Sequence, residues 1–273
     1  MKLNIFLLIL LIPCFLLSAD VRISYIPYNP GMFSVLNTIL GAVEKLEKGE
    51  YQGLSVDLGN TGLYYEKKKG NNWFEYYFEP IKFNLTEKPR DLTGKECGHL
   101  AMKTECAMTR ESAYNLLYNY FIVKSDINFE VTNFSDKYFR DKYVIGVHYR
   151  GTDKGSEAPK VKYEAMLGEI VQQLRLTKSS DIAIFIATDE KKFLDYMKAQ
   201  FPGLVIYQKA IRSKDRKAVH YRSKDRFIVG KQALIDSLLL SECNVLIRTT
   251  SNLSLWSGFF NPNLPIITLN RRY

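Results

Sequence analysis

The sequence predicts an α/β protein with two α/β domains, of which the C-terminal one is a doubly wound parallel sheet. The chain has 273 residues, of which 46% are apolar, 25% charged and 13% aromatic. This composition is typical of a globular protein, and the length allows two cores of about 100 to 150 residues each. After residue 142, apolar β-rich runs alternate with amphipathic helical segments. Such alternation indicates parallel strands that are covered by helices on both faces.

The N-terminus carries a short apolar segment at residues 5–17, behind a single Lys2. This run is too short for a membrane-spanning helix, which needs about 20 residues. The segment is typical of a signal peptide with cleavage before Asp20, which predicts export to the secretory pathway or the cell envelope. The alternative is that residues 1–19 stay uncleaved and tether the protein to a membrane.

Residues 20–140 form the predicted N-terminal domain, which is rich in aromatic residues and weaker in periodicity than the rest. Its predicted elements are strands at 21–28 and 54–58, helices at 33–48 and 109–121, and an aromatic cluster at 73–78. The charged stretch 136–142 marks the predicted boundary between the two domains.

Residues 141–273 form the predicted C-terminal domain. Its strands are apolar runs such as YVIGVHY and IAIFIA, and each is followed by a helical segment. The predicted strands are 143–149, 182–187, 204–207, 245–247 and 265–269, and the predicted helices are 162–174, 190–200, 227–243 and 253–259. The order of these elements predicts a parallel sheet with a nucleotide-binding type of topology.

Three cysteines follow the predicted cleavage site, at positions 97, 106 and 243. Their spacing does not match a structural zinc motif. Cys97 and Cys106 are close enough in sequence to form a disulfide in an oxidising compartment, and the sequence leaves this open. Sequons at Asn84, Asn133 and Asn252 would accept glycans only in a eukaryotic secretory host.

Polar residues follow the three internal strands of the predicted C-terminal sheet, in the segments 150–154, 188–190 and 248–252. In an open parallel sheet, ligands bind at the carboxyl ends of the strands, so these segments hold candidate ligand-binding residues. The hydroxyl-rich turn 248–252 can bind a phosphate through its backbone N–H groups, and the Arg guanidinium at position 150 can bind diphosphate oxygens as a fork. The alternative for the turn is a plain helix cap by Ser251 or Asn252.

Three further titratable residues are candidates because of their positions. His148 shares one face of its strand with Arg150 and can contact a base, a ribose or a phosphate, although a buried structural histidine is the simpler alternative. Asp236 lies within an apolar helix, so it either accepts a hydrogen bond from an internal donor or faces a ligand. Glu157 is a candidate general base or a surface charge. The sequence has no HExxH, DxD or Walker A motif, which argues against zincins, metal-dependent transferases and P-loop proteins.

The run His148-Tyr-Arg-Gly-Thr-Asp-Lys154, followed by Glu157, resembles the His-x-Arg-[Arg/Gly]-Thr-Asp-Lys segment of the alpha-1,6-fucosyltransferases. That group includes the rhizobial nodulation fucosyltransferases, and the protein O-fucosyltransferases are more distant members of the superfamily. Two further blocks agree in order and spacing, residues 187–189 and the helix with Asp236 that leads to residues 249–252. The resemblance covers about residues 141–260. The segment 30–34 is similar to the glycine-rich donor loop of the superfamily, with Ser in place of a usual Gly at position 34.

The resemblance implies a GT-B fold of two facing α/β domains, with the acceptor on the N-terminal side. It implies GDP-fucose as the donor, a glycan acceptor, inversion at the sugar carbon, and no metal or other cofactor. The residues that it implies are Arg150 for the β-phosphate, His148 and Asp236 for the guanosine, Thr250, Ser251, Asn252 and Gly31 for other donor contacts, and Glu157 as the base. The chain departs from the alpha-1,6 enzymes in lacking one residue between Lys154 and Glu157, and in lacking their coiled-coil and SH3-like additions.

The net charge leaves one alternative from another class of protein. Lys and Arg (38) exceed Asp and Glu (29), and eight basic residues lie between positions 209 and 226, as in some nucleic-acid-binding proteins. Asp215 and Asp225 dilute this cluster, and only Tyr221 offers a ring for base stacking. We therefore expect no nucleic-acid partner. A further alternative is an inactive transferase that binds a sugar nucleotide without turning it over.

Overall fold

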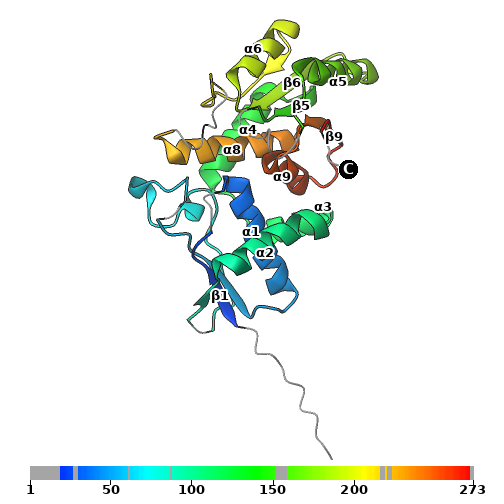
Figure 1. Cartoon of the computed structure of the whole chain (residues 1–273). Coiled ribbons are helices and arrows are strands. Elements are labelled where there is room, and N and C mark those ends of the chain that lie inside the picture. The colour runs from blue at the N-terminus through cyan, green and yellow to red at the C-terminus, as the bar shows by residue number, and fades with distance from the viewer. Residues whose placement is uncertain are drawn as a thin grey trace, which may run out of the picture.

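The computed structural model describes residues 19–26, 30–60, 62–86, 88–151, 159–215, 219 and 223–270, and the side chains of residues 101–107 lie outside this description. Two sheets organise the chain, one at each end of the molecule, with helices between them (Figure 1). The first sheet has the strand order β3-β2-β1-β4, and the second has the order β7-β6-β5-β8-β9.

The first sheet is a small, mostly parallel sheet. β1 (Asp20–Ile23) and β2 (Gly53–Val56) pair in parallel and are joined by α1 (Met32–Glu47). β4 (Arg90–Asp91) adds in parallel to β1, and β3 (Lys82–Phe83) is an antiparallel edge strand on β2. The strand predicted at 21–28 therefore ends earlier, at Ile23, while the predicted helix 33–48 is confirmed as α1.

Short helices and three longer ones complete the N-terminal half, with these bounds: η1 (Lys67–Lys69), η2 (Trp73–Tyr76), α2 (Gly94–Ala107), α3 (Arg110–Tyr120) and α4 (Ser125–Tyr138). The predicted aromatic cluster forms η2, where Trp73 and Phe74 are buried. The predicted helix at 109–121 is confirmed as α3, whereas α2 and α4 were not predicted from the sequence.

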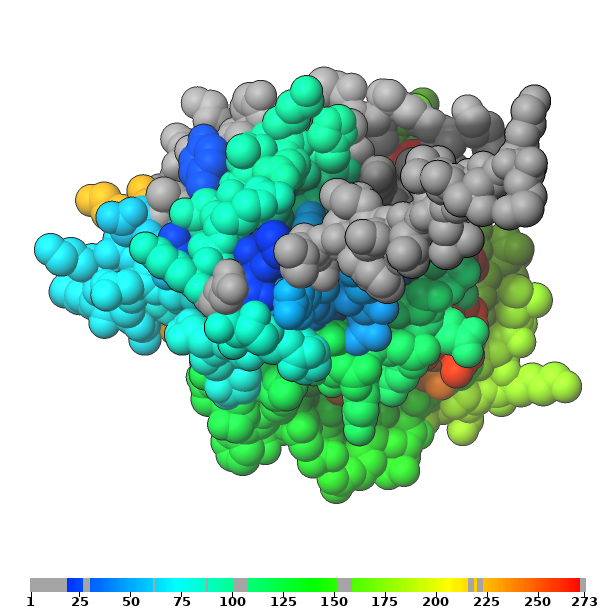
Figure 2. All heavy atoms as spheres, turned by 90° about the horizontal axis from the view of Figure 1, so that it is seen from below, coloured from blue at the N-terminus to red at the C-terminus, as the bar shows by residue number. Residues whose placement is uncertain are grey.

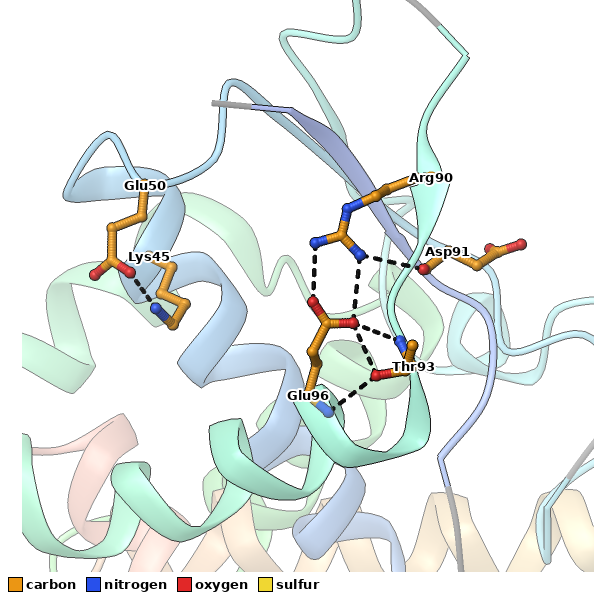
Figure 3. A network of polar contacts seen from close by, with 6 residues as sticks. All are labelled: Lys45, Glu50, Arg90, Asp91, Thr93 and Glu96. Carbon is orange, nitrogen blue, oxygen red and sulfur yellow. Dashed lines mark hydrogen bonds and ion pairs between the residues drawn. The ribbon is translucent and has the colours of Figure 1, made fainter. Parts of the chain in front are cut away.

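A capping box starts α2 and links it to the end of the first sheet (Figure 3). The Glu96 backbone N–H donates to Thr93 Oγ1 at 3.3 Å, and the Thr93 backbone N–H donates to Glu96 Oε2 at 2.8 Å. Arg90 adds an ion pair with Glu96 at 2.9 Å, and these contacts lower the pKa of the Glu96 carboxyl to about 2. The reciprocal hydrogen bonds satisfy backbone donors that the first helical turn leaves open. Nearby, Lys45 pairs with Glu50 beyond the end of α1.

The second sheet is parallel throughout, as predicted from the alternating apolar runs. Its elements are β5 (Tyr143–Tyr149), α5 (Tyr163–Leu176), β6 (Ile182–Thr188), α6 (Lys191–Gln200), β7 (Val205–Ile206), α8 (Arg226–Ser241), β8 (Val245–Arg248), α9 (Asn252–Phe260) and β9 (Ile266–Thr268). The predicted strands and helices of this half are all present, with ends that differ by at most two residues.

Both faces of the second sheet are buried, which explains its continuous apolar strands. Ile145 and Val147 of β5 belong to a core with α5 and α6, where Met166 and Phe193 are also fully buried. The alternate residues face the other core, which includes Phe185 of β6 together with α4 and α8. The sheet is therefore covered on both sides, and the fold class predicted from the sequence is confirmed.

The two halves share a continuous core. Trp256 of α9 is fully buried and donates from Nε1 to Asn37 Oδ1 of α1 at 2.6 Å. The ring of Tyr77 stacks on that of Phe227 of α8, with 5.7 Å between the ring centroids. Figure 1 and Figure 2 both show the cyan residues near η1 beside the yellow-orange start of α8. Helix α4, whose last turn overlaps the predicted boundary stretch 136–142, packs against α8. The halves are thus joined by buried contacts rather than by a linker alone.

Cys97 in α2 is a free, buried thiol, and burial raises its pKa to about 11. The side chain of Cys106 lies outside the described residues, so a disulfide with Cys106 has no support from the structure. Among the described residues, none of the helices is both long and apolar enough to span a bilayer. Residues 1–18 of the predicted leader, which spans residues 1–19, also lie outside the description.

Candidate functional site

A cavity of about 300 Å³ lies between the two halves. Its walls are the start of α1, the residues that follow β5 and β6, the segment before α8, one face of α8 and the start of α9. All but the first of these walls belong to the C-terminal half, at the carboxyl ends of its parallel strands. This is the place where open α/β sheets bind their ligands.

The strand ends in the C-terminal half hold Arg150 at the edge of the cavity. The Arg150 guanidinium forms an ion pair with Asp189, with 2.8 Å between Nη1 and Oδ2. The backbone N–H of Arg150 donates to Thr249 Oγ1 at 2.9 Å, and that of Gly151 donates to Asp189 Oδ1 at 3.1 Å. A side chain at position 151 would collide with Glu190, since a Cβ there would lie 2.0 Å from Glu190 Oε2. Residues 150 and 151 are therefore held by residues from two neighbouring strand ends.

Two helix N-termini meet at the cavity, one from each half of the molecule. Gly31 is the N-cap residue of α1 and Ser251 is that of α9, and neither helix has a side-chain capping hydrogen bond at this position. The Trp256–Asn37 hydrogen bond holds the two helices against each other. Because a helix N-terminus carries partial positive charge and exposed N–H groups, the pair favours an anion between them.

Four apolar side chains and one carboxylate belong to the cavity lining, and we call the part that they form the apolar slot. Ala210, Ile211, Val229 and Ala233 line the slot, and Asp236 lies one turn beyond Ala233 on α8. Residues this close on a helix share a face, so the carboxylate borders the apolar surface. A flat aromatic group whose edge carries N–H donors fits this combination of surfaces.

The Asp236 carboxylate is held by the segment that precedes α8. Gln208 Nε2 donates to Asp236 Oδ1 at 2.8 Å and to the Gln232 carbonyl at 3.1 Å. Arg212 stands behind it, where its guanidinium donates to the carbonyls of Gln208 and Ala210. Burial raises the pKa of the Asp236 carboxyl to about 6, against the opposing effects of the Arg212 charge and the Gln208 hydrogen bond.

The cavity gathers six of the eight residues that the sequence analysis singled out, while one points elsewhere and one is not described. The six lining residues are Gly31, His148, Arg150, Asp236, Ser251 and Asn252. Thr250 is not among them, because its backbone N–H donates to Asn270 Oδ1 at 2.7 Å and its hydroxyl donates to the Asn270 carbonyl at 3.3 Å. Thr250 thus ties the turn to the C-terminal segment. Glu157 falls within residues 152–158, outside the described part of the chain.

Several lining residues were not predicted as site residues. Asp189 follows a buried strand directly and lies in the predicted strand-end segment 188–190, although no role was predicted for it individually. Tyr64, whose hydroxyl accepts the Met32 backbone N–H at 2.9 Å, and Gln232 offered no such signal, because only the tertiary fold brings them to the cavity. Within the described ranges, no group of three or more His, Cys, Asp or Glu side chains is placed to hold a metal ion.

Two facing α/β halves, with a cavity at the strand ends of the C-terminal one, define a protein of the GT-B fold class. The family model described as nodulation protein Z (NodZ) matches residues 99–271, which is more than half of the chain. The chain therefore belongs to the NodZ family.

One sequence relative and two solved structures that are similar to this chain can be compared with it. The nodulation protein Z of Azorhizobium caulinodans is 28% identical over 151 residues, which are 51% of this chain and 45% of that relative. The chain thus matches less than half of the length of that relative. The fold is similar to that of the NodZ alpha-1,6-fucosyltransferase soaked with GDP-fucose (TM-score 0.63, 17% identity, 90% of this chain and 94% of that one). It is also similar to POFUT1 in complex with GDP-fucose (TM-score 0.54, 10% identity, 93% of this chain and 98% of that one).

Proposed function

We propose that this protein is an inverting glycosyltransferase that transfers fucose from GDP-fucose to a glycan acceptor. The observation that carries the proposal is the cavity that joins an anchored arginine, two helix N-termini and an apolar slot with a buried carboxylate. Membership of the NodZ family, and the GDP and GDP-fucose named for solved relatives of the same fold, support this choice of donor.

The diphosphate is proposed to lie between Arg150 and the N-termini of α1 and α9. A nucleoside diphosphate gains negative charge as the bond to the sugar breaks, and donors that already point at that charge lower the barrier. The guanidinium supplies charge in a forked geometry, and the helix N-termini supply backbone N–H groups. We propose that these groups suffice without a metal ion, so EDTA should leave turnover unchanged.

The guanine base is proposed to lie in the apolar slot, with its N–H edge toward Asp236. An ionised carboxylate has two acceptor oxygens, which match the adjacent ring N–H and amino group of guanine. Adenine presents a ring acceptor at the equivalent position, and this acceptor would face the carboxylate unfavourably. His148, buried at 3% exposure, lies on the wall of the same cavity and is proposed to contact the nucleoside.

The acceptor is proposed to be a glycan whose hydroxyl attacks the anomeric carbon from the side opposite to GDP, so that the configuration inverts. The acceptor oxygen forms the new bond, GDP leaves with the electron pair of the old one, and a base takes the hydroxyl proton. Glu157 is proposed as this base from the family resemblance alone.

One structural observation weakens the nucleic-acid alternative. Arg212 belongs to the basic cluster at 209–226, but its guanidinium is turned inward and donates to two backbone carbonyls. It therefore does not contribute to an exposed electrostatic surface, which is what non-specific nucleic-acid binding requires. An inactive sugar-nucleotide-binding protein stays the second candidate, because the donor cradle would look the same.

The proposed function is tested by measuring GDP release from GDP-fucose, with and without a panel of glycan acceptors. We expect acceptor-dependent release of GDP, and a rise in melting temperature with GDP that UDP does not produce. Binding of GDP without turnover on any acceptor would favour the inactive protein. A larger melting shift with UDP-sugars than with GDP would contradict the proposed donor.

We propose that residues 1–19 act as a signal peptide that places the protein in the secretory pathway or the cell envelope. The support is the apolar run 5–17 behind Lys2 and the small residues before Asp20. N-terminal sequencing of the protein purified from its host should begin at Asp20. A membrane-bound protein that retains Met1 would favour the uncleaved tether instead.

A further inference from the structure

We propose that Asp189 is a positioning residue that holds the Arg150 guanidinium in the orientation required by the leaving diphosphate. This inference rests on the proposed function and assigns a role to a residue that the sequence places in the strand-end segment 188–190 without a role of its own. Asp189 and Arg150 both line the cavity, and their side chains are 13% and 21% exposed. The ion pair is thus largely shielded from water, unlike an exposed surface pair.

The Asp189 carboxylate contacts both the guanidinium of Arg150 and the backbone N–H of the residue that follows it. Asp189 Oδ2 pairs with Arg150 Nη1 at 2.8 Å, while Asp189 Oδ1 accepts the Gly151 backbone N–H at 3.1 Å. On the other side, Thr249 Oγ1 accepts the Arg150 backbone N–H at 2.9 Å. The backbone before and after the arginine side chain is therefore fixed, and so is the guanidinium at its tip.

The strand register makes this arrangement rigid. Tyr149 of β5 pairs with Thr188 of β6, so the residues that follow them, Arg150 and Asp189, leave the sheet side by side. The same strand pairs with β8 on its other side, where His148 stands opposite Arg248. The three strand ends form one fixed edge, and a side chain held by that edge is already in place before the ligand arrives.

A carboxylate beside a cation has two opposing effects on anion binding. It reduces the net positive charge that the diphosphate meets, and it fixes the plane of the guanidinium fork. If charge were decisive, removing Asp189 would strengthen GDP binding. If orientation is decisive, removing Asp189 weakens the contact that develops in the transition state, since misplacement by about 1 Å can cost about 100-fold in rate. The double anchoring of residue 150 favours orientation.

The test is a double-mutant cycle with Asp189→Ala, Arg150→Ala and both together, read as turnover of GDP-fucose and as the ratio of GDP to GMP affinity. We expect Asp189→Ala to lower turnover by about 10- to 100-fold, and the double variant to be no worse than Arg150→Ala alone. Asp189→Asn, which keeps the size and an acceptor oxygen, should recover part of the loss. Asp195→Ala removes the carboxylate of an exposed α6 pair with Lys191, about half exposed on both sides, and serves as the matched control with unchanged turnover.

Chemical rescue provides a readout that a structural role would not give. Millimolar guanidinium chloride should restore part of the turnover of Arg150→Ala, because Asp189 can hold the free guanidinium in the vacated place. The same salt should not rescue the double variant. Rescue of both variants, losses that multiply in the double variant, or tighter GDP binding by Asp189→Ala would each overturn the positioning role. If the wild-type chain binds neither GDP nor GDP-fucose, the proposed function fails first, and the positioning role fails with it.

Discussion

The buried carboxyl of Asp236 gives opposite pH dependences to donor binding and to folding stability. Burial raises its pKa from the ordinary value of 3.8 to about 6. Only the ionised form can accept both N–H groups of guanine, and at pH 5 about a tenth of the carboxyl is ionised, against about nine tenths at pH 7. GDP affinity should therefore fall about tenfold between pH 7 and pH 5 through this group alone.

Folding stability should change in the other direction. Between pH 3.8 and pH 6 the folded state binds the Asp236 proton more tightly than the unfolded state does, so the free energy of unfolding rises as the pH falls through this window. The shift of the pKa corresponds to about 3 kcal/mol, which is the destabilisation that the buried charge causes above pH 6 and that Asp236→Asn should remove.

Calorimetric titration of GDP at about pH 5 to 8 measures the first effect, and urea unfolding at about pH 4 to 8 measures the second. The second ionisation of the phosphate, near pH 6, also affects GDP binding, so the pH dependence of Asp236→Asn is the reference. The difference between the wild type and this variant isolates the Asp236 carboxyl. Identical pH dependences of GDP affinity in the two proteins would refute the proposed guanine contact, and identical unfolding curves would refute the raised pKa.

Substitutions at three other positions test the fold and the cavity. Arg150→Ala should lower turnover by about 100- to 1000-fold in steady-state assays. Arg150→Lys should recover only part of this loss, because an ammonium lacks the forked geometry. Near-normal turnover of Arg150→Ala would contradict the diphosphate site. Gly230→Ala should lower the free energy of unfolding by about 1 to 3 kcal/mol in urea titrations, because the new Cβ would lie 2.2 Å from the Tyr77 hydroxyl where the halves meet. An unchanged midpoint of urea unfolding would show that Tyr77 moves freely. Asn37→Leu leaves the buried Trp256 N–H without its acceptor and should cost about 1 to 3 kcal/mol, seen as a lower melting temperature; an unchanged value would mean that another acceptor takes its place.

The sequence by itself determined the second sheet and the edge of that sheet at which the cavity lies. The runs YVIGVHY and IAIFIA are apolar on both faces, and a strand of this kind needs helices on both sides, whatever the rest of the chain does. Polar residues directly after such strands must lie at one edge, since the carboxyl ends of parallel strands coincide. Arg150, Ser251 and Asn252 were therefore predictable as neighbours across about 100 residues of chain, and they do line one cavity.

Only the tertiary structure decided which polar atoms meet. β3 and β4 have two residues each, too few for any period to appear, and their existence depends on pairing with β2 and β1. The hydroxyl of Thr250 lies in the predicted turn, yet it is used by Asn270, a residue of no apparent motif. The support of Asp236 by Gln208, and the approach of α1 to α9 through Trp256, join positions far apart in the chain. Local patterns specify which face of an element is buried, whereas the partner of each buried polar group is set by long-range packing that no local pattern encodes.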